Sequence, residues 1–248
     1  MSDIKELKKV LDEIIDLVFP PRCPVCDRPL LISDKDRGIC RKCIEILPVI
    51  KGDRCIKCGR ALDDKNEENM CAECKKNPVR NFDRGMALCE YDDTVRHMIY
   101  RFKYGKRREY GDVLGRLMGK RFAASIKRAG IQGVIPVPLH EKRYDQRGYN
   151  QAELLAESIG RETDIPCYPH YVKRCRNTLP MKTLSGEKRQ NNLKKAFIIG
   201  QNDVKLDKVL LVDDIYTTGS TLDAVAKELK RSGVKKVYFL TLSIGSGR

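Results

Sequence analysis

Apolar residues recur along the chain at two spacings, and the two spacings predict different elements. From residue 82 onward, short apolar runs typical of buried strands alternate with segments whose apolar positions recur every three or four residues, as in amphipathic helices. The runs predict strands at 85–91, 134–137, 197–199, 209–212 and 237–244. The helical spacing predicts helices near 95–102 and at 113–128, 151–160 and 222–231. Gly160 is expected to end the third of these helices. This alternation predicts an α/β domain over 82–248, built on a doubly wound parallel sheet with an extra antiparallel piece.

The first 81 residues lack this alternation. Between Ile4 and Val18 the apolar residues fall on one helical face, which predicts an N-terminal amphipathic helix within 1–19 that ends at Pro20 and Pro21. Residues 20–78 contain few large apolar side chains, and 78–81 has the composition of a linker to the second domain.

Eight of the eleven cysteines lie before residue 75 as four Cys-x-x-Cys pairs. The pairs are Cys23/Cys26, Cys40/Cys43, Cys55/Cys58 and Cys71/Cys74. A two-residue spacer lets both thiolates of a pair bind one tetrahedral ion, so the pattern predicts a double zinc-ribbon module over 20–78 with about two structural zinc ions. Sequential and cross-braced pairing both remain open. A disulfide scaffold fits poorly with a chain that shows no export signal, and iron–sulfur ligands usually have other spacings.

Metal binding should supply much of the folding free energy of this module, because the segment has little apolar core of its own. We therefore expect the loss of one ligand, Cys26 or Cys58, to loosen the module while the second domain stays folded. Cys89, Cys167 and Cys175 are scattered, and we expect them to be packing or surface residues and not nucleophiles.

Charge narrows the kind of partner. The formal net charge of +15 over 248 residues favours an anionic partner, either a phosphate-rich substrate, a nucleic acid or both, although a merely solvated basic surface is the simpler alternative. No apolar run approaches the roughly 20 residues of a membrane span, and no signal peptide is visible. We therefore expect a cytoplasmic protein without a membrane span.

The run V-L-L-V-D-D-I-Y-T-T-G-S-T-L at 209–222 carries the strongest functional signal. It predicts a buried strand that ends in two carboxylates, then a turn rich in hydroxyls, then a helix. Free N–H groups and the helix dipole favour an anion at such a turn. Carboxylates repel phosphate but accept hydrogen bonds from sugar hydroxyls, so the run predicts a site for a ribose 5-phosphate. An ordinary strand–turn–helix is the alternative, but it does not call for two acids before the turn.

This run resembles the signature of the type I phosphoribosyltransferases, which bind phosphoribosyl pyrophosphate (PRPP) with magnesium. The resemblance implies that Asp213 and Asp214 hold the 2- and 3-hydroxyls of the ribose. It implies a 5-phosphate site made of the next residues, Thr217, Thr218, Gly219, Ser220 and Thr221. Purine-type members carry an acid at the position of Thr217, so a purine acceptor is not supported.

Three further basic segments belong to the second domain. A basic loop after the strand at 134–137 contains Arg143 and Arg147, which we expect to stabilise the departing pyrophosphate together with magnesium. His140 in this loop is expected to form hydrogen bonds and not to act as a base. The long polar segment 174–192 is typical of a flap over a site.

In the third segment, around 96–110, basic residues alternate with aromatic residues. This pattern can follow a single nucleic-acid strand by pairing with phosphates and stacking on bases. The candidate DNA-binding residues are Arg101, Lys103, Tyr104, Lys106, Arg107 and Arg108. A solvated basic helix face is the alternative, and part of the segment can instead serve the phosphates of PRPP.

Taken together, the motifs are similar to those of the ComF family of competence proteins (ComFC or GntX type) from Leu7 to about Leu242. They are F-P-P-x-C-x-x-C, the double zinc ribbon, K-Y-G, V-P-L, R-G-Y-N-Q, L-S-x-x-x-R and V-D-D-x-Y-T-T-G-S-T. The resemblance implies a cytoplasmic bacterial protein that handles incoming single-stranded DNA during natural transformation, with a helicase-like ATPase as partner. One departure is Met181, where family members usually carry Gln.

Two functions from different classes remain open on the sequence. In the first, the protein is an enzyme that transfers phosphoribosyl to an unidentified acceptor with loss of pyrophosphate. In the second, it is a non-catalytic phosphosugar sensor or DNA-binding adaptor that keeps the pocket without turnover. No acceptor-binding motif in the sequence separates them.

Overall fold

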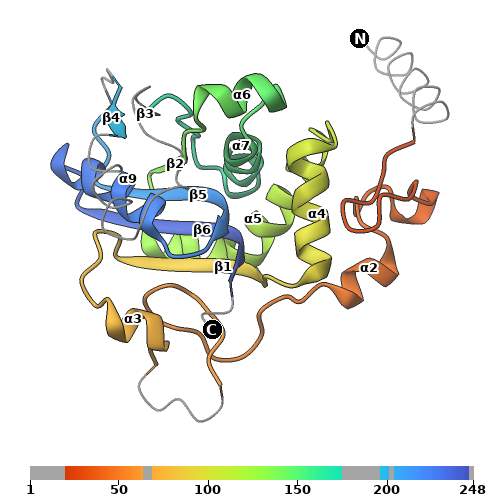
Figure 1. The fold of residues 1–248 in the computed structure, drawn as a ribbon, viewed down its shortest axis with the longest axis horizontal. Coiled ribbons are helices and arrows are strands. Elements are labelled where there is room, and N and C mark those ends of the chain that lie inside the picture. The colour runs from red at the N-terminus through yellow and green to blue at the C-terminus, as the bar shows by residue number, and fades with distance from the viewer. Residues whose placement is uncertain (1–19, 64–68, 175–195, 201–203, 246–248) are drawn as a thin grey trace. The chain divides into compact units, whose positions relative to one another are not determined.

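The computed structural model describes residues 20–63, 69–174, 196–200 and 204–245 (Figure 1). They belong to two compact units, divided between Leu47 and Pro48. The division falls inside the predicted 20–78 module, between its two cysteine clusters. The predicted helix within 1–19 and the flap residues from 175 onward, with Cys175 and Met181, lie outside the described residues.

The first unit is small and is held mainly by its cysteines. It contains a 3-10 turn, η1 (Ile32–Asp34), and one short helix, α2 (Arg41–Ile46). Buried cysteines and a few apolar residues, among them Ile39 at 0% exposure, make up its interior. Because the unit has so little apolar interior, we expect its stability to depend on a metal held by the four cysteines.

The second unit is an α/β domain with a parallel central sheet. The sheet has the order β1-β6-β5-β2, and every neighbouring pair is parallel. Its strands are β1 (Arg84–Glu90), β2 (Gly133–Pro136), β5 (Lys208–Tyr216) and β6 (Lys236–Ile244). Helices α5 (Tyr110–Ala129) and α7 (Gln151–Thr163) lie on one face and α9 (Ser220–Arg231) lies on the other, while α4 (Asp93–Tyr104) lies beside α5 near the carboxyl ends of the strands (Figure 1). The predicted doubly wound sheet is confirmed.

The extra antiparallel piece is a separate two-stranded sheet. It pairs β3 (Val172–Arg174) with β4 (Phe197–Ile199), in which Arg174 faces Phe197 in register. The predicted strand at 197–199 thus has its predicted bounds, although its partner strand was not predicted.

Two local predictions were wrong. Helix α7 does not end at Gly160 but continues to Thr163, and Asp164 closes it in the left-handed conformation. A Cβ at Gly160 would lie 2.7 Å from the carbonyl oxygen of Ile165, so glycine is needed there for the chain to fold back closely. The basic loop after β2 contains a helix, α6 (Glu141–Arg147), capped by His140 and by Gly148 at φ 78°.

The second cysteine cluster belongs to a ribbon that closes the free edge of β1. This ribbon starts at Pro48 and includes the short helix α3 (Ala72–Lys76). The N–H of Glu90 donates to the carbonyl of Pro48 at 2.9 Å, and the N–H of Gly85 donates to that of Lys57 at 2.8 Å. Because an edge strand otherwise presents unpaired backbone groups, the ribbon completes the sheet on this side.

Two further bonds complete this edge. The N–H of Ile50 donates to the carbonyl of Leu88 at 2.9 Å, and the Arg54 guanidinium donates to the carbonyl of Ala87 at 3.0 Å. Gly59 lies so close to β1 that a Cβ there would be 2.8 Å from the Cα of Met86. The ribbon therefore packs against the strand with no space for a side chain at this position.

The cysteines of this second cluster share one hydrophobic core with the sheet and with α9. Phe82, Tyr216 and Phe239 belong to the same core. The Phe82 and Phe239 rings meet edge to face with centroids 4.9 Å apart, and Tyr216 stacks on Phe239 at 5.1 Å. For Cys58 we therefore revise the expectation that loss of a ligand leaves the second domain folded, because the cluster is part of that domain's core.

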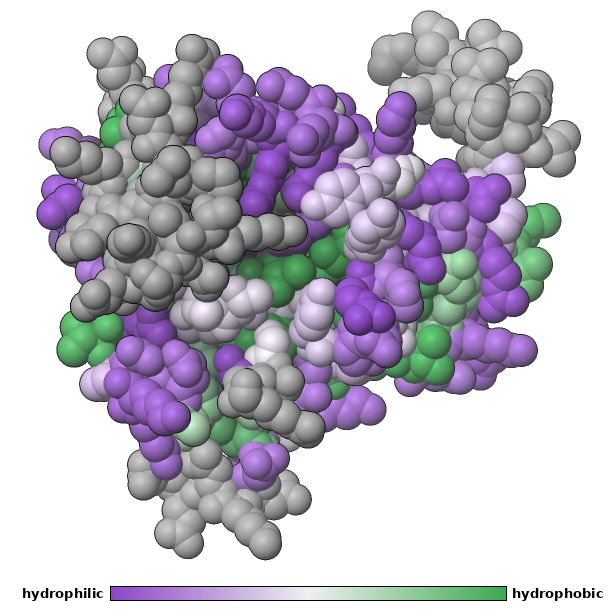
Figure 2. Space-filling view, viewed as in Figure 1, coloured by the Kyte–Doolittle hydropathy of each residue, from purple (hydrophilic) through white to green (hydrophobic). Residues whose placement is uncertain are grey.

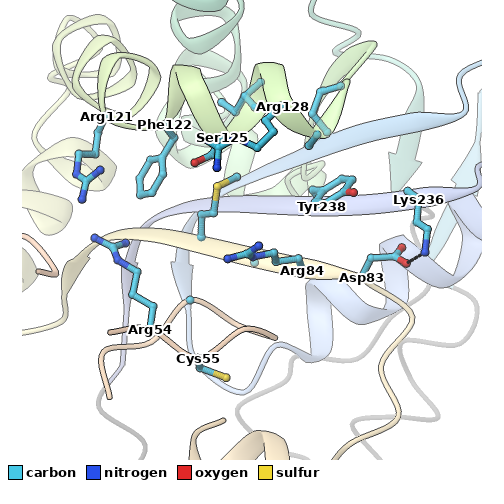
Figure 3. Close-up of a pocket in the computed structure, with 16 residues that line it drawn as sticks. Arg54, Cys55, Asp83, Arg84, Arg121, Phe122, Ser125, Arg128, Lys236 and Tyr238 are labelled. Atoms are coloured by element: carbon cyan, nitrogen blue, oxygen red, sulfur yellow. Dashed lines mark hydrogen bonds and ion pairs between the residues drawn. The ribbon is translucent and has the colours of Figure 1, made fainter. Parts of the chain in front are cut away.

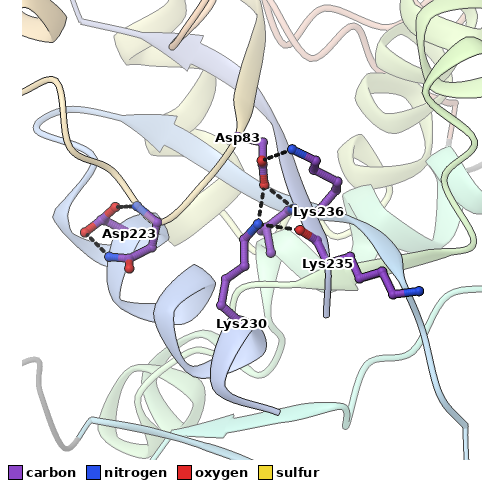
Figure 4. Close-up of polar contacts among 7 residues, drawn as sticks. Asp83, Asp223, Lys230, Lys235 and Lys236 are labelled. Carbon is purple, nitrogen blue, oxygen red and sulfur yellow. Dashed lines mark hydrogen bonds and ion pairs between the residues drawn. The ribbon is translucent and has the colours of Figure 1, made fainter. Parts of the chain in front are cut away.

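The predicted linker 78–81 is tied to the α/β domain. The Asn81 backbone N–H and side-chain amide both donate to the carboxylate of Asp223 in α9, at 2.6 and 2.9 Å (Figure 4). Fixing Asn81 in this way sets the position from which the chain enters β1.

A carboxylate at the start of β1 joins three elements (Figure 4). Asp83 accepts from Lys230 at 2.7 Å, from Lys236 at 2.9 Å and from the N–H of Val237 at 2.9 Å. Burial raises the pKa of Asp83, but the hydrogen bonds from Lys230, Val237 and Lys236 outweigh it and hold this pKa below its ordinary value of 3.8. Asp83 thus fixes β1 to the end of α9 and the start of β6.

Much of the face seen in Figure 2 is hydrophilic, as expected for a chain with 33% charged residues. Within the described part of the chain, no helix is both long enough and apolar enough to cross a bilayer.

We predict that Asp83→Asn lowers the free energy of unfolding by about 1–2 kcal/mol, since charge-assisted hydrogen bonds to a partly exposed carboxylate are lost. A depressed pKa contributes stability above the unfolded-state value and loses it only as pH falls through the folded-state value. The difference from wild type should therefore stay constant from about pH 6 to about pH 8.

Urea unfolding followed by circular dichroism measures this difference. Asp207→Asn is the matched control, because its 2.8 Å ion pair with Lys235 joins side chains that are 50% and 71% exposed. Such an exposed pair should contribute less than about 1 kcal/mol. Equal stabilities of the Asp83 variant and the wild type would contradict the role assigned to this carboxylate.

Candidate functional site

The two acids of the strongest sequence motif lie at the carboxyl end of β5, a strand flanked by β6 and β2. Asp214 is buried and Asp213 is half-buried, and the N–H of Asp214 donates to Oδ1 of Asp213 at 2.8 Å. Burial, and then the neighbouring Asp214 carboxylate, raise the pKa of Asp213 to about 7. Ligands of open α/β sheets bind at the carboxyl edge of the strands, so the acids occupy the expected place for a site.

A lysine from another element pairs with one of these acids. Lys103, in the last turn of α4, forms an ion pair with Oδ2 of Asp214. The two side chains are 18% and 11% exposed, so water screens this pair poorly. The predicted DNA-binding role of Lys103 remains a prediction, and the structure pairs this lysine with Asp214. An ion pair between residues this far apart in the chain leaves no local signal in the sequence.

The loop after the acids presents donors at the start of α9. Gly219 has φ 74° and precedes the first helical residue, Ser220. A Cβ at Gly219 would collide with the Tyr216 hydroxyl, so a side chain at this position would not fit. Thr218 Oγ1 lies 2.8 Å from Ser220 Oγ, and Thr217 and Thr218 are both exposed. The N-terminal N–H groups of a helix, its dipole and nearby hydroxyls favour an anion, so the loop has the features that the sequence predicted for a phosphate site.

Basic residues lie near the acids. Burial lowers the pKa of Arg174, the charge of Arg143 lowers it further, and Asp213 opposes both, so these three groups lie close enough to interact electrostatically. The Arg174 guanidinium lies over the Phe197 ring, 5.5 Å from its centroid. The sequence placed Arg174 only at the start of a flap. Its place at the end of a short strand, before a long polar segment, is a signal that could have identified it.

His140 caps the start of α6. Its Nδ1 accepts the N–H of Lys142 at 3.2 Å, at the start of α6. Burial, and then the charges of Arg174, Lys142 and Arg143, lower the pKa of His140 below 6.5. The prediction that His140 forms hydrogen bonds is confirmed.

Arg147 is held by two neighbours. Its guanidinium donates to Oε1 of Gln151 at 2.6 Å and to Oη of Tyr104 at 3.2 Å, and it lies 5.0 Å from the centroid of the Tyr104 ring. The predicted role of Arg147 at the pyrophosphate remains a prediction. In the described structure, Arg147 joins the end of α6 to α4 and the start of α7.

Neighbouring residues of the R-G-Y-N-Q motif strengthen this connection. Tyr149 donates its hydroxyl to the carbonyl of Phe102 at 2.5 Å. Asn150 donates to the carbonyl of Val137 at 3.1 Å and caps α7 by accepting the N–H of Ala152 at 3.2 Å. The motif therefore fixes the segment that carries Arg143 against α4 and β2.

The remaining DNA-binding candidates differ in exposure. Lys106 and Arg108 are exposed, Arg101 is half-buried, and Arg107 lies 3.8 Å from the carboxylate of Glu109. Tyr104 contacts Arg147 but is still 55% exposed, and Tyr100 is 63% exposed. The centroids of these two rings lie 5.1 Å apart. Two exposed rings next to exposed cations remain at the end of α4.

The eight paired cysteines form two clusters that fit zinc. One contains Cys23, Cys26, Cys40 and Cys43, the other Cys55, Cys58, Cys71 and Cys74. Within each cluster all the sulfur atoms lie within 4.8 Å of one another. The Cys26–Cys40 and Cys58–Cys71 sulfur distances are both 3.6 Å, close to the roughly 3.8 Å edge of a tetrahedron with Zn–S bonds of about 2.3 Å. The pairing is sequential, which the sequence had left open.

Of the other cysteines, Cys89 is buried and Cys167 is half-buried. Burial raises the pKa of Cys89 and of Cys167 to about 12. A thiol of this kind stays protonated at neutral pH and is a poor nucleophile. That neither cysteine is a nucleophile remains a prediction.

Comparison with known proteins assigns a domain family to an N-terminal and to a C-terminal segment of the chain. The double zinc ribbon domain family matches residues 14–75, and the phosphoribosyl transferase domain family matches residues 148–244. Competence protein F of Haemophilus influenzae is 33% identical over 227 residues, which are 88% of this chain and 95% of that protein. The chain belongs to the ComF family of competence proteins.

Two further ComF relatives match over most of their length. DNA utilization protein YhgH of Escherichia coli (strain K12) is 30% identical over 224 residues, covering 89% of this chain and 96% of its own. Competence protein ComFC of Bacillus subtilis is 25% identical over 232 residues, which are 85% of this chain and 89% of that protein. The predicted family, the zinc-ribbon module and the phosphoribosyltransferase fold are thereby confirmed.

Proposed function

We propose that this ComF protein binds PRPP with magnesium at the carboxyl edge of β5, as a phosphoribosyltransferase that acts with single-stranded DNA in DNA uptake. The observation that carries the proposal is the succession of two carboxylates and a hydroxyl-rich helix start on consecutive elements, Lys208–Tyr216 and Ser220–Arg231. One half of this arrangement suits a diol, and the other half suits a phosphate.

In the proposed complex, Asp213 and Asp214 accept hydrogen bonds from the ribose hydroxyls. Residues 217–221 bind the 5-phosphate through backbone N–H groups and side-chain hydroxyls. Lys103 balances the charge of Asp214 and allows two adjacent carboxylates to remain at one site.

Arg143 and Arg174 would neutralise the pyrophosphate in this proposal, and the support is that the charges of both Arg143 and Asp213 act on the Arg174 guanidinium. Carboxylate and phosphate oxygens are the ligands that magnesium prefers, and the ion would supply charge neutralisation of the leaving group. In the transfer reaction the bond between ribose C1 and pyrophosphate breaks, and an acceptor forms the new bond at C1.

Single-stranded DNA is the proposed second ligand. Exposed Tyr100, Tyr104, Lys106 and Arg108 offer stacking faces and cations at the end of α4. The names of the relatives, competence proteins and a DNA utilization protein, agree with a ligand of this kind. A helicase-like ATPase partner and a cytoplasmic location belong to the same proposal.

We predict that Asp213→Asn combined with Asp214→Asn weakens PRPP binding by at least about ten-fold per residue, because charge-assisted hydrogen bonds to the diol are lost. Isothermal titration with PRPP and magnesium measures the affinity, and Asp207→Asn serves as the control acid. Unchanged PRPP affinity in the double variant would contradict the proposal that these two acids bind the sugar. Pyrophosphate release with candidate acceptors then separates a transferase from an adaptor that binds PRPP without turnover.

For DNA we predict a steep loss of affinity with salt, with a log–log slope of about −0.7 for each phosphate contacted on a single strand. Lys106→Ala with Arg108→Ala should make this slope shallower. Tyr100→Ala should weaken binding with the slope unchanged, because stacking is uncharged. Tyr100 gives a cleaner test than Tyr104, whose ring also holds Arg147.

Fluorescence anisotropy of a labelled oligonucleotide over a salt series measures both quantities. Lys127→Ala, an exposed lysine near the end of α5, is the control for total charge. A wild-type protein that fails to bind at low salt would remove the DNA part of the proposal and leave the PRPP site standing.

A further inference from the structure

We propose that the second unit contains a separate nucleotide site, in a cavity between the second ribbon, β1 and α5. The cavity has a volume of about 580 Å³. Figure 3 shows Arg54 reaching it from the ribbon, Arg84 from β1, and Arg121 and Phe122 from α5. Its ligand would carry a phosphate group and a flat, weakly polar ring.

The cavity carries an excess of positive charge. Five cationic side chains line it, and they are Arg54, Arg84, Arg121, Arg128 and Lys236. Asp83 is the acid on the lining, and its carboxylate is already bound by Lys230 at 2.7 Å and by Lys236 at 2.9 Å. In the described part of the chain, no acid forms an ion pair with Arg84, Arg121 or Arg128.

Two of these cations share one aromatic ring. The guanidinium carbons of Arg54 and Arg121 each lie 5.5 Å from the centroid of the Phe122 ring. Hydrogen bonds to the carbonyls of Ala87 and Ile50 fix Arg54 in this position. Like charges gathered without an acid repel each other, and a bound phosphate would remove this repulsion while offering oxygens for bidentate hydrogen bonds.

The rest of the lining suits a ring. Met86 and Tyr238 lie on the sheet, and Phe122, Ile126 and Ile131 come from α5 and the turn after it. The volume falls within the range of about 300–1,000 Å³ that is typical of small-molecule sites. A single phosphate would leave most of this space unfilled, whereas a nucleotide places its phosphate at the arginines and its base against the apolar wall.

This cavity lies away from the proposed PRPP site. Arg84 and Lys236 are the first residues of β1 and β6, and Asp213 lies opposite Thr241, near the other end of β6. Because the four strands are parallel, the cavity lies toward the amino edge and the acids lie at the carboxyl edge. The two proposals can therefore fail independently.

The methyl group of Met86 reports on this cavity. The zinc-loaded full chain, labelled with ¹³C-methyl methionine, is titrated with dTMP, with a short oligo-dT and with inorganic phosphate, each in the absence and in the presence of PRPP. We expect a saturable shift of the Met86 signal. Met98 and Met118, which are fully buried and do not line the cavity, should stay in place.

Replacing single arginines of the cavity tests whether they bind the phosphate of dTMP. Arg121→Ser should weaken the dTMP-dependent shift at least about ten-fold, as expected for one lost charge-assisted contact, and Arg84→Ser provides a second test on another element. Lys120→Ser, an exposed neighbour on α5 that does not line the cavity, should leave the affinity unchanged.

Comparing the ligands shows whether the site takes a free nucleotide or a nucleotide within a single strand. Saturation by dTMP supports a free nucleotide, and a shift with oligo-dT alone supports a nucleotide of a single strand. A Met86 signal that moves with neither, that moves equally in Arg121→Ser, or that responds equally to inorganic phosphate and dTMP would overturn the nucleotide site.

Discussion

The second zinc ribbon closes the free edge of β1, and the rest of the α/β domain depends on this contact. A parallel sheet that ends at β1 would leave a row of N–H and carbonyl groups unpaired. The ribbon satisfies them from Pro48, Ile50, Arg54 and Lys57, and its cysteines enter the core that holds Phe82, Tyr216 and Phe239.

That core extends directly to the proposed sugar-phosphate site. Tyr216, the last residue of β5, stacks on Phe239 with centroids 5.1 Å apart, and its hydroxyl lies where a Cβ of residue 219 would be. Burial raises the pKa of Tyr216. The second cysteine cluster, the aromatic rings and Leu222 near the start of α9 therefore belong to one packed core, which connects the cluster to the turn before α9.

The sequence predicted those features that a short segment specifies by itself. The run at 209–222 has a buried strand, acids, a glycine turn and an amphipathic helix in direct succession, and the structure has β5 and α9 there with small changes at their ends. The Cys-x-x-Cys pairs specified two clusters for the same reason. Helix α6 escaped prediction because it has seven residues and none of them is buried, so it has no apolar periodicity. The Lys103–Asp214 ion pair and the packing of Gly59 on β1 depend on contacts between distant parts of the chain, which no local pattern records.

The positive charge of the chain is divided among different tasks. Lys103 balances an acid, Lys230 and Lys236 hold Asp83, and Arg147 joins α6 to α4. The net charge of +15 therefore does not locate an anion site, because these residues already have partners within the protein. Among the described residues that remain, Arg143 and Arg174 lie near the acids, exposed cations follow the rings at the end of α4, and several arginines line the cavity between the ribbon, β1 and α5.

Hydrogen exchange measured by mass spectrometry on Cys58→Ser and Cys26→Ser tests the dependence on the second ribbon most directly. Loss of a ligand from the second cluster should release the edge of β1, so that amides of 84–90 and of the turn at 216–221 exchange at least about ten-fold faster than in wild type. Cys26→Ser changes the other cluster, in the first compact unit, and should leave both segments protected. Equal protection of β1 in the two variants would contradict the account, because the sheet would then be complete without its metal-bound ribbon.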